Sequence, residues 1–372
     1  MYVSAVDLFC GAGGLTHGLE QAGISVEAGF DVDNDCRFPY ETNNEATFFA
    51  QDIGRIAREE PEVIADHFDD DADATLLAGC APCQPFSPLT HGEDSADHNK
   101  YGMLRAFLEI VRYTNPDLVV MENVYEIRSA DVYDEFVDGL GELGYNLNPD
   151  TDKRVYCPEY GIPQTRRRWV LVASRDGRID LGTPSHPDPN EYPTVEECID
   201  HLPAIEAGET HSNDPLHTSR RLTDENLQRI RQSEPGGDWT DWDDDLLLEC
   251  HKKSTGQSYK SVYGRMVANK PAPTITTQFY NLGSGRFGHY DTDQDRAISL
   301  REGAMIQTFP QDYQFVKESD EVELNKIGRL IGNAVPPKLG EVIGERVIDF
   351  LNWSDRQSSL SDFSVRHPLS DI

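Results

Sequence analysis

The stretch VSAVDLFCGAGGLTHGLEQAG, residues 3–23, predicts the fold class. Residues 3–9 have the composition of a short strand, and the glycine-rich segment 10–14 ends it. Residues 15–22 then show the apolar spacing of a helix. A strand, a glycine turn and a helix open a βαβ unit, in which glycines let the backbone approach a ligand closely. The alternative is a packing turn of any α/β protein.

The pattern continues outward from this stretch. Further strands are predicted at residues 24–30, 75–78, 118–121 and 170–173, and further helices at residues 35–41 and 103–113. Strands that alternate with helices predict an α/β fold with a parallel, doubly wound sheet covered on both faces. Asp31 follows the second strand, where a carboxylate can bind ribose hydroxyls.

The composition changes after residue 174. Residues 174–278 are rich in Pro, His, Asp and Trp without clear periodicity, and helical spacing returns at residues 300–308 and 339–350. We therefore predict three parts, with a frayed tail as the last. They are a cofactor-binding catalytic domain of residues 1–175 and 326–353, a smaller domain with a hinge at 176–325, and a tail at 354–372.

The charge balance is strongly acidic. The 372 residues include 66 acidic and 33 basic side chains, a net charge of −33, which argues against a nucleic-acid binder. However, 24 of the basic residues are arginine, and aspartates cluster at residues 69–71 and 243–245. Salt screens such a field within a few ångströms, so the composition predicts a halophilic archaeon as the source. An acidic cytosolic protein of an ordinary organism is the alternative.

Hydropathy indicates a cytoplasmic chain with no membrane partner. The mean hydropathy is −0.56, no run of 18 apolar residues occurs, and the first residues lack a signal-peptide pattern. Seven cysteines, scattered along the chain, are not typical of a disulfide framework, so we expect reduced thiols.

The loop GCAPCQPFS, residues 79–87, contains the candidate nucleophile Cys83. It follows a predicted strand, where the active centre of a doubly wound sheet is expected, and its prolines can fix the geometry that a nucleophilic thiol needs. The alternatives are a redox pair with Cys80 or half of a zinc site. The chain has no second close Cys or His pair, so we predict no metal.

Two other segments contain charged residues that are candidates for the active site. Glu122 directly follows the strand at 118–121, although an isolated glutamate there also fits a solvated loop. In QTRRRW, residues 164–169, strand alternation should send Arg166 and Arg168 to one face and Arg167 to the other. A surface basic run is the alternative.

Taken together, the segments resemble the cytosine-C5 methyltransferase family over residues 3–352. The motifs occur in the family's order: DLFCGAGG at 7–14, PCQ at 82–84, ENV at 122–124, QTRRR at 164–168, RAISLREGAMIQTFP at 296–310 and IGNAV at 331–335. The resemblance implies a Rossmann-like sheet dependent on S-adenosylmethionine, with residues 176–325 as target-recognition domain.

The resemblance also implies the catalytic roles. The Cys83 thiolate would add to C6 of a cytosine flipped out of duplex DNA, because the edge of a stacked base is buried. Glu122 would contact N3 and the exocyclic amine, Arg168 would contact O2, and Arg166 would hold the site in place.

For S-adenosylmethionine the resemblance implies a pocket that joins the two ends of the chain. Asp31 would bind the ribose, Asp52 would accept from the adenine amine, and Asn333 would fix residues 332–335 beside the first turn. The remaining implied cofactor-binding residues are Phe9, Gly11, Gly13, Leu15, Ile53 and Pro82.

Further expectations concern partners and two departures from the family. We expect a monomer that binds double-stranded DNA, with a cognate restriction endonuclease as a possible partner. Lys100 stands where the family usually has an arginine, and Cys80, where the family has Gly or Pro, is expected to be a spectator. Arg265 and Arg286 should join the site arginines on one concave basic face.

Three other functions are alternatives for this sequence. A transfer-RNA methyltransferase shares these motifs, but it usually has a Cys-Phe-Thr tripeptide that this chain lacks. A silent DNA-binding relative would usually have lost Cys83 or Glu122. A nicotinamide oxidoreductase would leave the Pro-Cys-Gln loop and the arginines unexplained.

Overall fold

The computed structural model describes residues 1–82, 102–147, 152–253, 260–317 and 320–366, without the side chains of Asp152 and residues 355–366. Its centre is a seven-stranded sheet in the order β3-β2-β1-β4-β5-β7-β6. The strands are β1 Val3–Leu8, β2 Ser25–Asp31, β3 Thr47–Ala50, β4 Ala74–Gly79, β5 Leu118–Val124, β6 Asp152–Tyr156 and β7 Arg167–Ser174. Cys83 and Lys100 lie outside the described residues.

The first five strands are parallel, and β7 runs antiparallel to both β5 and β6. Successive strand residues alternate between two hydrophobic clusters, with Leu76 in one and Leu77 in the other. Both faces of the sheet are therefore covered, which confirms the predicted α/β, doubly wound class. The antiparallel direction of β7 is a feature that the strand pattern did not predict.

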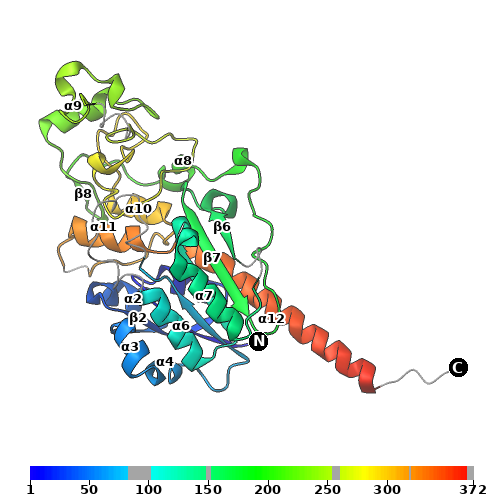
Figure 1. Ribbon diagram of the computed structural model, residues 1–372. Helices are drawn as coiled ribbons and strands as arrows, with labels where there is room; N and C mark the ends of the chain where they lie inside the picture. Colours follow the sequence, from blue (N-terminus) through cyan, green and yellow to red (C-terminus); the bar gives the residue numbers. More distant parts are fainter. Residues whose placement is uncertain (83–101, 148–151, 254–259, 318–319, 367–372) are drawn as a thin grey trace.

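Helices cover the two faces in separate groups. Helices α1 Gly14–Gln21 and α12 Pro337–Arg366 pack together on one face. The other face is covered by α3 Ile53–Glu59, α4 Glu62–Ala65, α6 Gly102–Thr114 and α7 Asp131–Glu142. Figure 1 shows α6 and α7 on the side of the sheet opposite α12. The described part is completed by α2 Arg37–Asn43, α8 Val195–Ile199, α9 Asp224–Gln232, α10 Leu300–Ile306, α11 Leu324–Asn333 and the hairpin of β8 Thr210–His211 and β9 Asp214–Thr218.

The two ends of the chain meet at the first turn. A Cβ built on Gly14 would lie 2.1 Å from the carbonyl oxygen of Val335, and one on Gly18 would lie 2.1 Å from that of Pro337. Only glycine permits this backbone contact, so residues 332–335 pack against the N-terminal turn as expected. The predicted frayed tail at 354–372 is wrong as far as Arg366, because α12 continues to that residue and extends away from the body (Figure 1).

The predicted smaller domain, residues 176–325, contains two small hydrophobic clusters. One contains Ile230, Leu282 and Ala297, and the other contains Trp239, Trp242 and Leu246. Figure 1 shows α9 at the end of the molecule opposite α3 and α4. Other residues of the region belong to the same large cluster as α1 and α12, so it is joined to the sheet by a shared core. Within the described residues, no helix is long and apolar enough to cross a membrane.

Candidate active site

A cavity of about 310 Å³ lies at the carboxyl ends of β1, β2 and β4. The strand order reverses at this place, which is where doubly wound sheets bind ligands. Six of the nine predicted cofactor-binding residues line it: Phe9, Gly11, Leu15, Asp31, Pro82 and Asn333.

The turn after β1 has an unusual backbone. Phe9 and Gly11 both have positive φ angles, 59° and 54°. This conformation, unusual for phenylalanine, points the Gly11 amide at Asp31 Oδ2, 3.0 Å away, while Asp31 Oδ1 accepts from the Asp33 amide at 2.8 Å. Burial raises the pKa of Asp31, and these two amides oppose the shift. Each carboxylate oxygen can accept one further hydrogen bond from a ligand.

Asp7 is a second carboxylate of the cavity, and the sequence motifs predict no separate role for it. It is 1% exposed, and its Oδ2 accepts from the Thr16 hydroxyl at 2.7 Å. Its Oδ1 is buried without a hydrogen-bond partner in the described structure. Burial raises the pKa of Asp7 to about 7. A buried unpaired oxygen on a cavity wall is suited to bind a polar ligand group.

Three predicted cofactor residues do not line the cavity. Gly13 precedes α1 with a φ of 88°, and a Cβ there would lie 2.4 Å from Asn44 Nδ2. Asp52 caps α3 by accepting from the amides of Gly54 and Arg55. Ile53 is 2% exposed and belongs to the core. Their positions here are explained by turn geometry, capping and packing.

The cavity also contains residues that the motifs did not indicate. Val32 lines it with 74% of its surface exposed, so it offers an apolar wall. Arg329 on α11 forms ion pairs with Asp33 and Asp35, the latter at 2.8 Å. These pairs connect α11 to the segment after β2. No local sequence pattern predicts these pairs, because Arg329 and its partners are almost 300 positions apart.

Glu122, at the end of β5, is held on both carboxylate oxygens. Its Oε1 forms an ion pair with Arg168 Nε at 2.9 Å but has no hydrogen-bond partner among the described residues, and its Oε2 accepts from the Cys80 thiol at 2.9 Å. The side chains of Glu122 and Arg168 are 2% and 13% exposed. Glu122 is therefore no solvated loop residue. Cys80, which was expected to be a spectator, contacts it.

Arg166 holds distant segments together. It is 3% exposed and donates to the carbonyl oxygens of Ile275 at 3.1 Å and Ala334 at 3.2 Å. Burial, followed by the charge of Arg168, lowers its pKa to about 10. Arg167 is exposed and its guanidinium lies over Tyr156. The predicted alternation of the three arginines is thus observed.

A larger, open cleft of about 840 Å³ adjoins the cavity, and Arg329 and Asn333 line both. Asn333 is exposed, so the close approach of the two chain ends comes from the Val335 backbone against Gly14. Basic and amide side chains dominate the lining: Arg220, Thr277, Gln278, Asn281, Asn325, Lys326, Arg329 and Asn333, with one carboxylate, Glu323.

The expected concave face of arginines is wrong for Arg265. This side chain is 1% exposed and donates to the carbonyl oxygens of Ser233, His289 and Gln294 while it pairs with Asp295. Its guanidinium is therefore already occupied in the fold. Arg286 is half-buried and donates to the Gly237 carbonyl oxygen.

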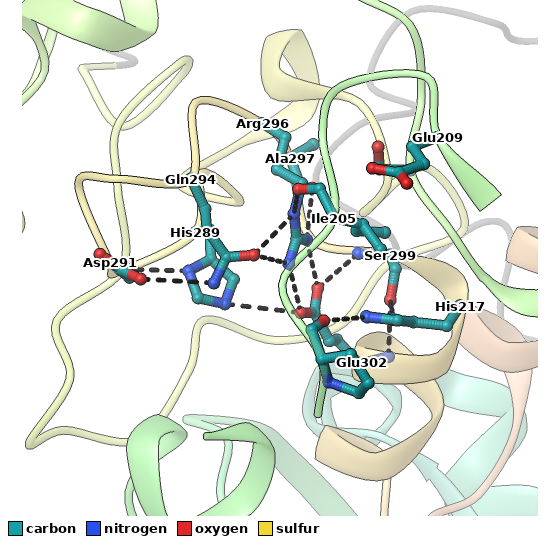
Figure 2. Close-up of polar contacts among 12 residues, drawn as sticks. Ile205, Glu209, His217, His289, Asp291, Gln294, Arg296, Ala297, Ser299 and Glu302 are labelled. Carbon is teal, nitrogen blue, oxygen red and sulfur yellow. Dashed lines mark hydrogen bonds and ion pairs between the residues drawn. The ribbon is translucent and has the colours of Figure 1, made fainter. Parts of the chain in front are cut away.

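The motif RAISLREGAMIQTFP forms a buried network around Glu302 (Figure 2). Arg296 binds both oxygens of Glu302 at 2.7 Å, and the Ser299 amide donates to Oε2 at 2.6 Å. His289 lies 3.4 Å from Oε1, and His217 Nδ1 lies 2.8 Å from Ser299 Oγ. The residues are 0–3% exposed, so the network connects α10 to the preceding loops, and it lines neither the cavity nor the open cleft described above.

Comparison with known proteins agrees with this arrangement. The family model for C-5 cytosine-specific DNA methylases matches residues 3–349. The type II methylase M.HgiDII of Herpetosiphon aurantiacus is 44% identical over 94% of this chain and 96% of its own length. The type II methyltransferase M1.HphI of Haemophilus parahaemolyticus is 28% identical over 94% and 87%.

Solved structures show the same fold. The Dnmt2 methyltransferase of S. pombe has a TM-score of 0.58 at 17% identity, with 95% of this chain and all of that chain covered. The sheet and its cavity are those of a doubly wound α/β protein, a class that binds ligands at the carboxyl ends of its strands. The chain belongs to the C-5 cytosine-specific DNA methylase family, and it is a DNA cytosine-5 methyltransferase.

Proposed function

We propose that the chain takes the methyl group from S-adenosylmethionine and modifies a flipped-out cytosine in a specific duplex DNA sequence through a covalent bond between Cys83 and C6. Family membership supports this reaction. The buried Glu122–Arg168 ion pair at 2.9 Å supports the assignment of this reaction to the described residues. It lies at the same edge of the sheet as the cavity.

The cavity has features that fit S-adenosylmethionine. Asp31 has lone pairs for ribose hydroxyls, the unpaired Asp7 Oδ1 suits an amine or a cation, and Val32 suits a flat apolar ring. The remaining proposed contacts are Phe9, Gly11, Leu15, Pro82 and Asn333, while Gly13, Asp52 and Ile53 would act through the turn and α3. When bound, the cofactor supplies an electrophilic methyl group.

The chain's own residues then act on the base. The Cys83 thiolate adds to C6, which makes C5 electron-rich, and loss of the C5 proton with elimination of the thiolate later frees the enzyme. Glu122 contacts N3 and the exocyclic amine and stabilises positive charge on the ring. Arg168 contacts O2, and Arg166 keeps the wall of the site in place through two carbonyl groups.

We assign DNA binding to the open cleft and its surroundings. Arg220, Lys326 and Arg329 can contact phosphates, and the amide side chains can contact base edges. The proposed division is a catalytic domain of residues 1–175 and 326–353 and a target-recognition domain of residues 176–325. The two small separate clusters support a distinct recognition part. A monomer suffices for this arrangement, and a restriction endonuclease of the same specificity is the proposed partner.

A trapping experiment tests the mechanism. Methylation-sensitive sequencing of DNA from cells that express the protein identifies the target sequence. A duplex with 5-fluorocytosine at the target should then form a covalent adduct, because fluorine blocks the final elimination. Cys83→Ala should form no adduct and transfer no methyl group. An adduct in Cys83→Ser, or methylation of transfer RNA in place of DNA, contradicts the proposal.

We also propose that the enzyme is adapted to high salt, as in a halophilic archaeon. The exposed aspartates at 69–71 and 243–245 support this, together with the net charge of −33. Methylation should rise with KCl from dilute buffer towards about 1 M, where the Debye length is roughly 3 Å. Ordinary phosphate binding weakens by roughly 10³ to 10⁵ between dilute and moderate salt, so loss of activity by about 0.2 M KCl would refute the adaptation.

A further inference from the structure

The Cys80 thiol lies between the cavity proposed for S-adenosylmethionine and Glu122, the carboxylate proposed to contact the target cytosine. It lies directly after β4, and its backbone amide donates to the Leu8 carbonyl oxygen at 3.2 Å. Gly79 pairs with Met121 in the parallel register of β4 and β5, so the next residues along, Cys80 and Glu122, lie beside each other. Strand pairing therefore determines the contact between their side chains.

The two partners of Glu122 differ in kind. Arg168 is a permanent cation that attracts Oε1 as an ion pair without a hydrogen bond, whereas Cys80 is a neutral, weak donor that hydrogen-bonds Oε2 at 2.9 Å. A carboxylate with one fixed oxygen can still rotate about that contact. The second contact fixes the plane of the carboxyl group.

Cys80 also lines the cofactor cavity, together with Ala81 and Pro82. Asn123 donates to the Ala81 carbonyl oxygen at 3.0 Å, so the segment that carries the thiol is attached to β5 a second time. The thiol therefore has a fixed position on the wall that separates Glu122 from the cavity. A spectator side chain would need no such attachment.

We propose that Cys80 is a positioning residue that orients Glu122 for its contact with the target cytosine. The thiol donates a hydrogen bond to Oε2 and so fixes the plane of the Glu122 carboxyl group, while the ion pair with Arg168 attracts Oε1. This inference rests on the role of Glu122 in the proposed function. It adds a determinant of reactivity that is separate from the nucleophile.

Single-turnover methylation of target duplex by the full chain tests the proposal. Cys80→Ala should lower the rate by roughly ten-fold, because a hydrogen bond to a charged group is lost. Cys80→Ser, whose hydroxyl can donate in the same way, should recover most of the rate. Cys198→Ala is the matched control, since it removes a half-buried thiol far along the chain and should leave the rate unchanged.

The kind of rate defect separates positioning from mere structural support. A misoriented carboxylate should slow methyl transfer at saturating duplex without changing the half-saturating duplex concentration, and Cys80→Ser should reverse this defect. A variant that is only less stable would change its unfolding curve without changing the rate per folded molecule.

A Glu122→Gln variant distinguishes the two possible failures. If Glu122→Gln keeps the wild-type rate, the proposed function is wrong about Glu122. If Glu122→Gln is inactive while Cys80→Ala matches Cys198→Ala in the rate per folded molecule, the positioning role is overturned and the proposed function stands. Failure of Cys80→Ser to restore the rate also overturns it.

Discussion

Two buried glutamates, each paired with an arginine, lie in different parts of the molecule and differ in how completely they are bound. Glu302 has both oxygens bound by Arg296 at 2.7 Å, with further donors from Ser299 and His289. Glu122 has a single contact to Arg168 at 2.9 Å and a thiol on its other oxygen.

The difference indicates what each carboxylate can do. Burial alone would raise the pKa of Glu302, but the charge and hydrogen bonds of Arg296 hold it well below its ordinary value. Such a group is fixed as an anion, with no lone pair available for a substrate, and serves the fold. Glu122 retains free lone pairs and has a weak donor, the Cys80 thiol, so it can exchange a weak partner for a ligand.

The largest expected effect concerns Glu122, the carboxylate with fewer bonding partners. Glu122→Gln should lower the methylation rate by roughly 10² to 10⁴, the range typical of a lost acid–base group. Gln has nearly the same volume but leaves the buried Arg168 without its counter-charge, so the free energy of unfolding should also fall, by roughly 1–3 kcal/mol, and rates are compared per folded molecule. The measurements are single-turnover rates and urea unfolding. A large loss of stability with an unchanged rate per folded molecule would make Glu122 a structural residue like Glu302.

The converse result is expected for the saturated pair. Arg296→Met leaves Glu302 as an unpaired buried charge, so the free energy of unfolding should fall by roughly 3–5 kcal/mol. Methylation per folded molecule should change only a few-fold, because the network does not reach the cavity. Urea unfolding and active-site titration measure the two quantities. Arg167→Met, an exposed arginine of β7, is the control and should unfold like the wild type.

Asp7 extends the comparison to a carboxylate with an unpaired oxygen. Its pKa is about 7 in the folded protein because of burial, against 3.8 for a free side chain. Between these values the folded state binds more protons than the unfolded state, so this group lowers stability as pH rises from about 4 to about 7.

Asp7→Asn should remove this loss of stability with rising pH, because an amide side chain does not titrate. The variant should gain stability relative to the wild type across this pH range, to an excess on the order of 4 kcal/mol above pH 7. Urea unfolding at several pH values measures it, with the exposed Asp71→Asn as control. A constant difference across the range would mean that Asp7 is ionised throughout.

The sequence predicted the part of the site that is built from regular elements. Asp31 and Glu122 follow strands with clear patterns, so their common edge could be derived from topology alone. The alternation of Arg166 and Arg168 followed from the period of a strand. In each case a short local pattern determined the direction of the side chain.

The remaining features depend on packing between distant segments. Arg265 is buried by loops without periodicity, so nothing in the sequence distinguished it from a surface arginine. Arg329 meets its partners only because α11 packs near the end of β2. The contact between Cys80 and Glu122 depends on the register of β4 and β5, which a pattern of apolar residues does not specify.

The smallest expected effect concerns an ion pair that solvent reaches. Arg329 is 39% exposed and pairs with Asp33 and Asp35 beside the cofactor cavity. Exposed pairs contribute roughly 0–1 kcal/mol and are screened by salt, so Arg329→Met should weaken binding of S-adenosylmethionine by about five-fold or less. Calorimetric titration in dilute buffer and in about 1 M KCl measures the effect.

The salt dependence is the decisive part of this last experiment. If Arg329 acts through its charge, the affinities of the variant and the wild type should converge as KCl rises, because salt removes the interaction that the mutation removes. The rate defect of Glu122→Gln should persist at high salt, since its partner Arg168 is only 13% exposed and little screened. A defect of Arg329→Met that is equally large at high salt would mean that its side chain contacts the cofactor directly or shapes the cavity by packing.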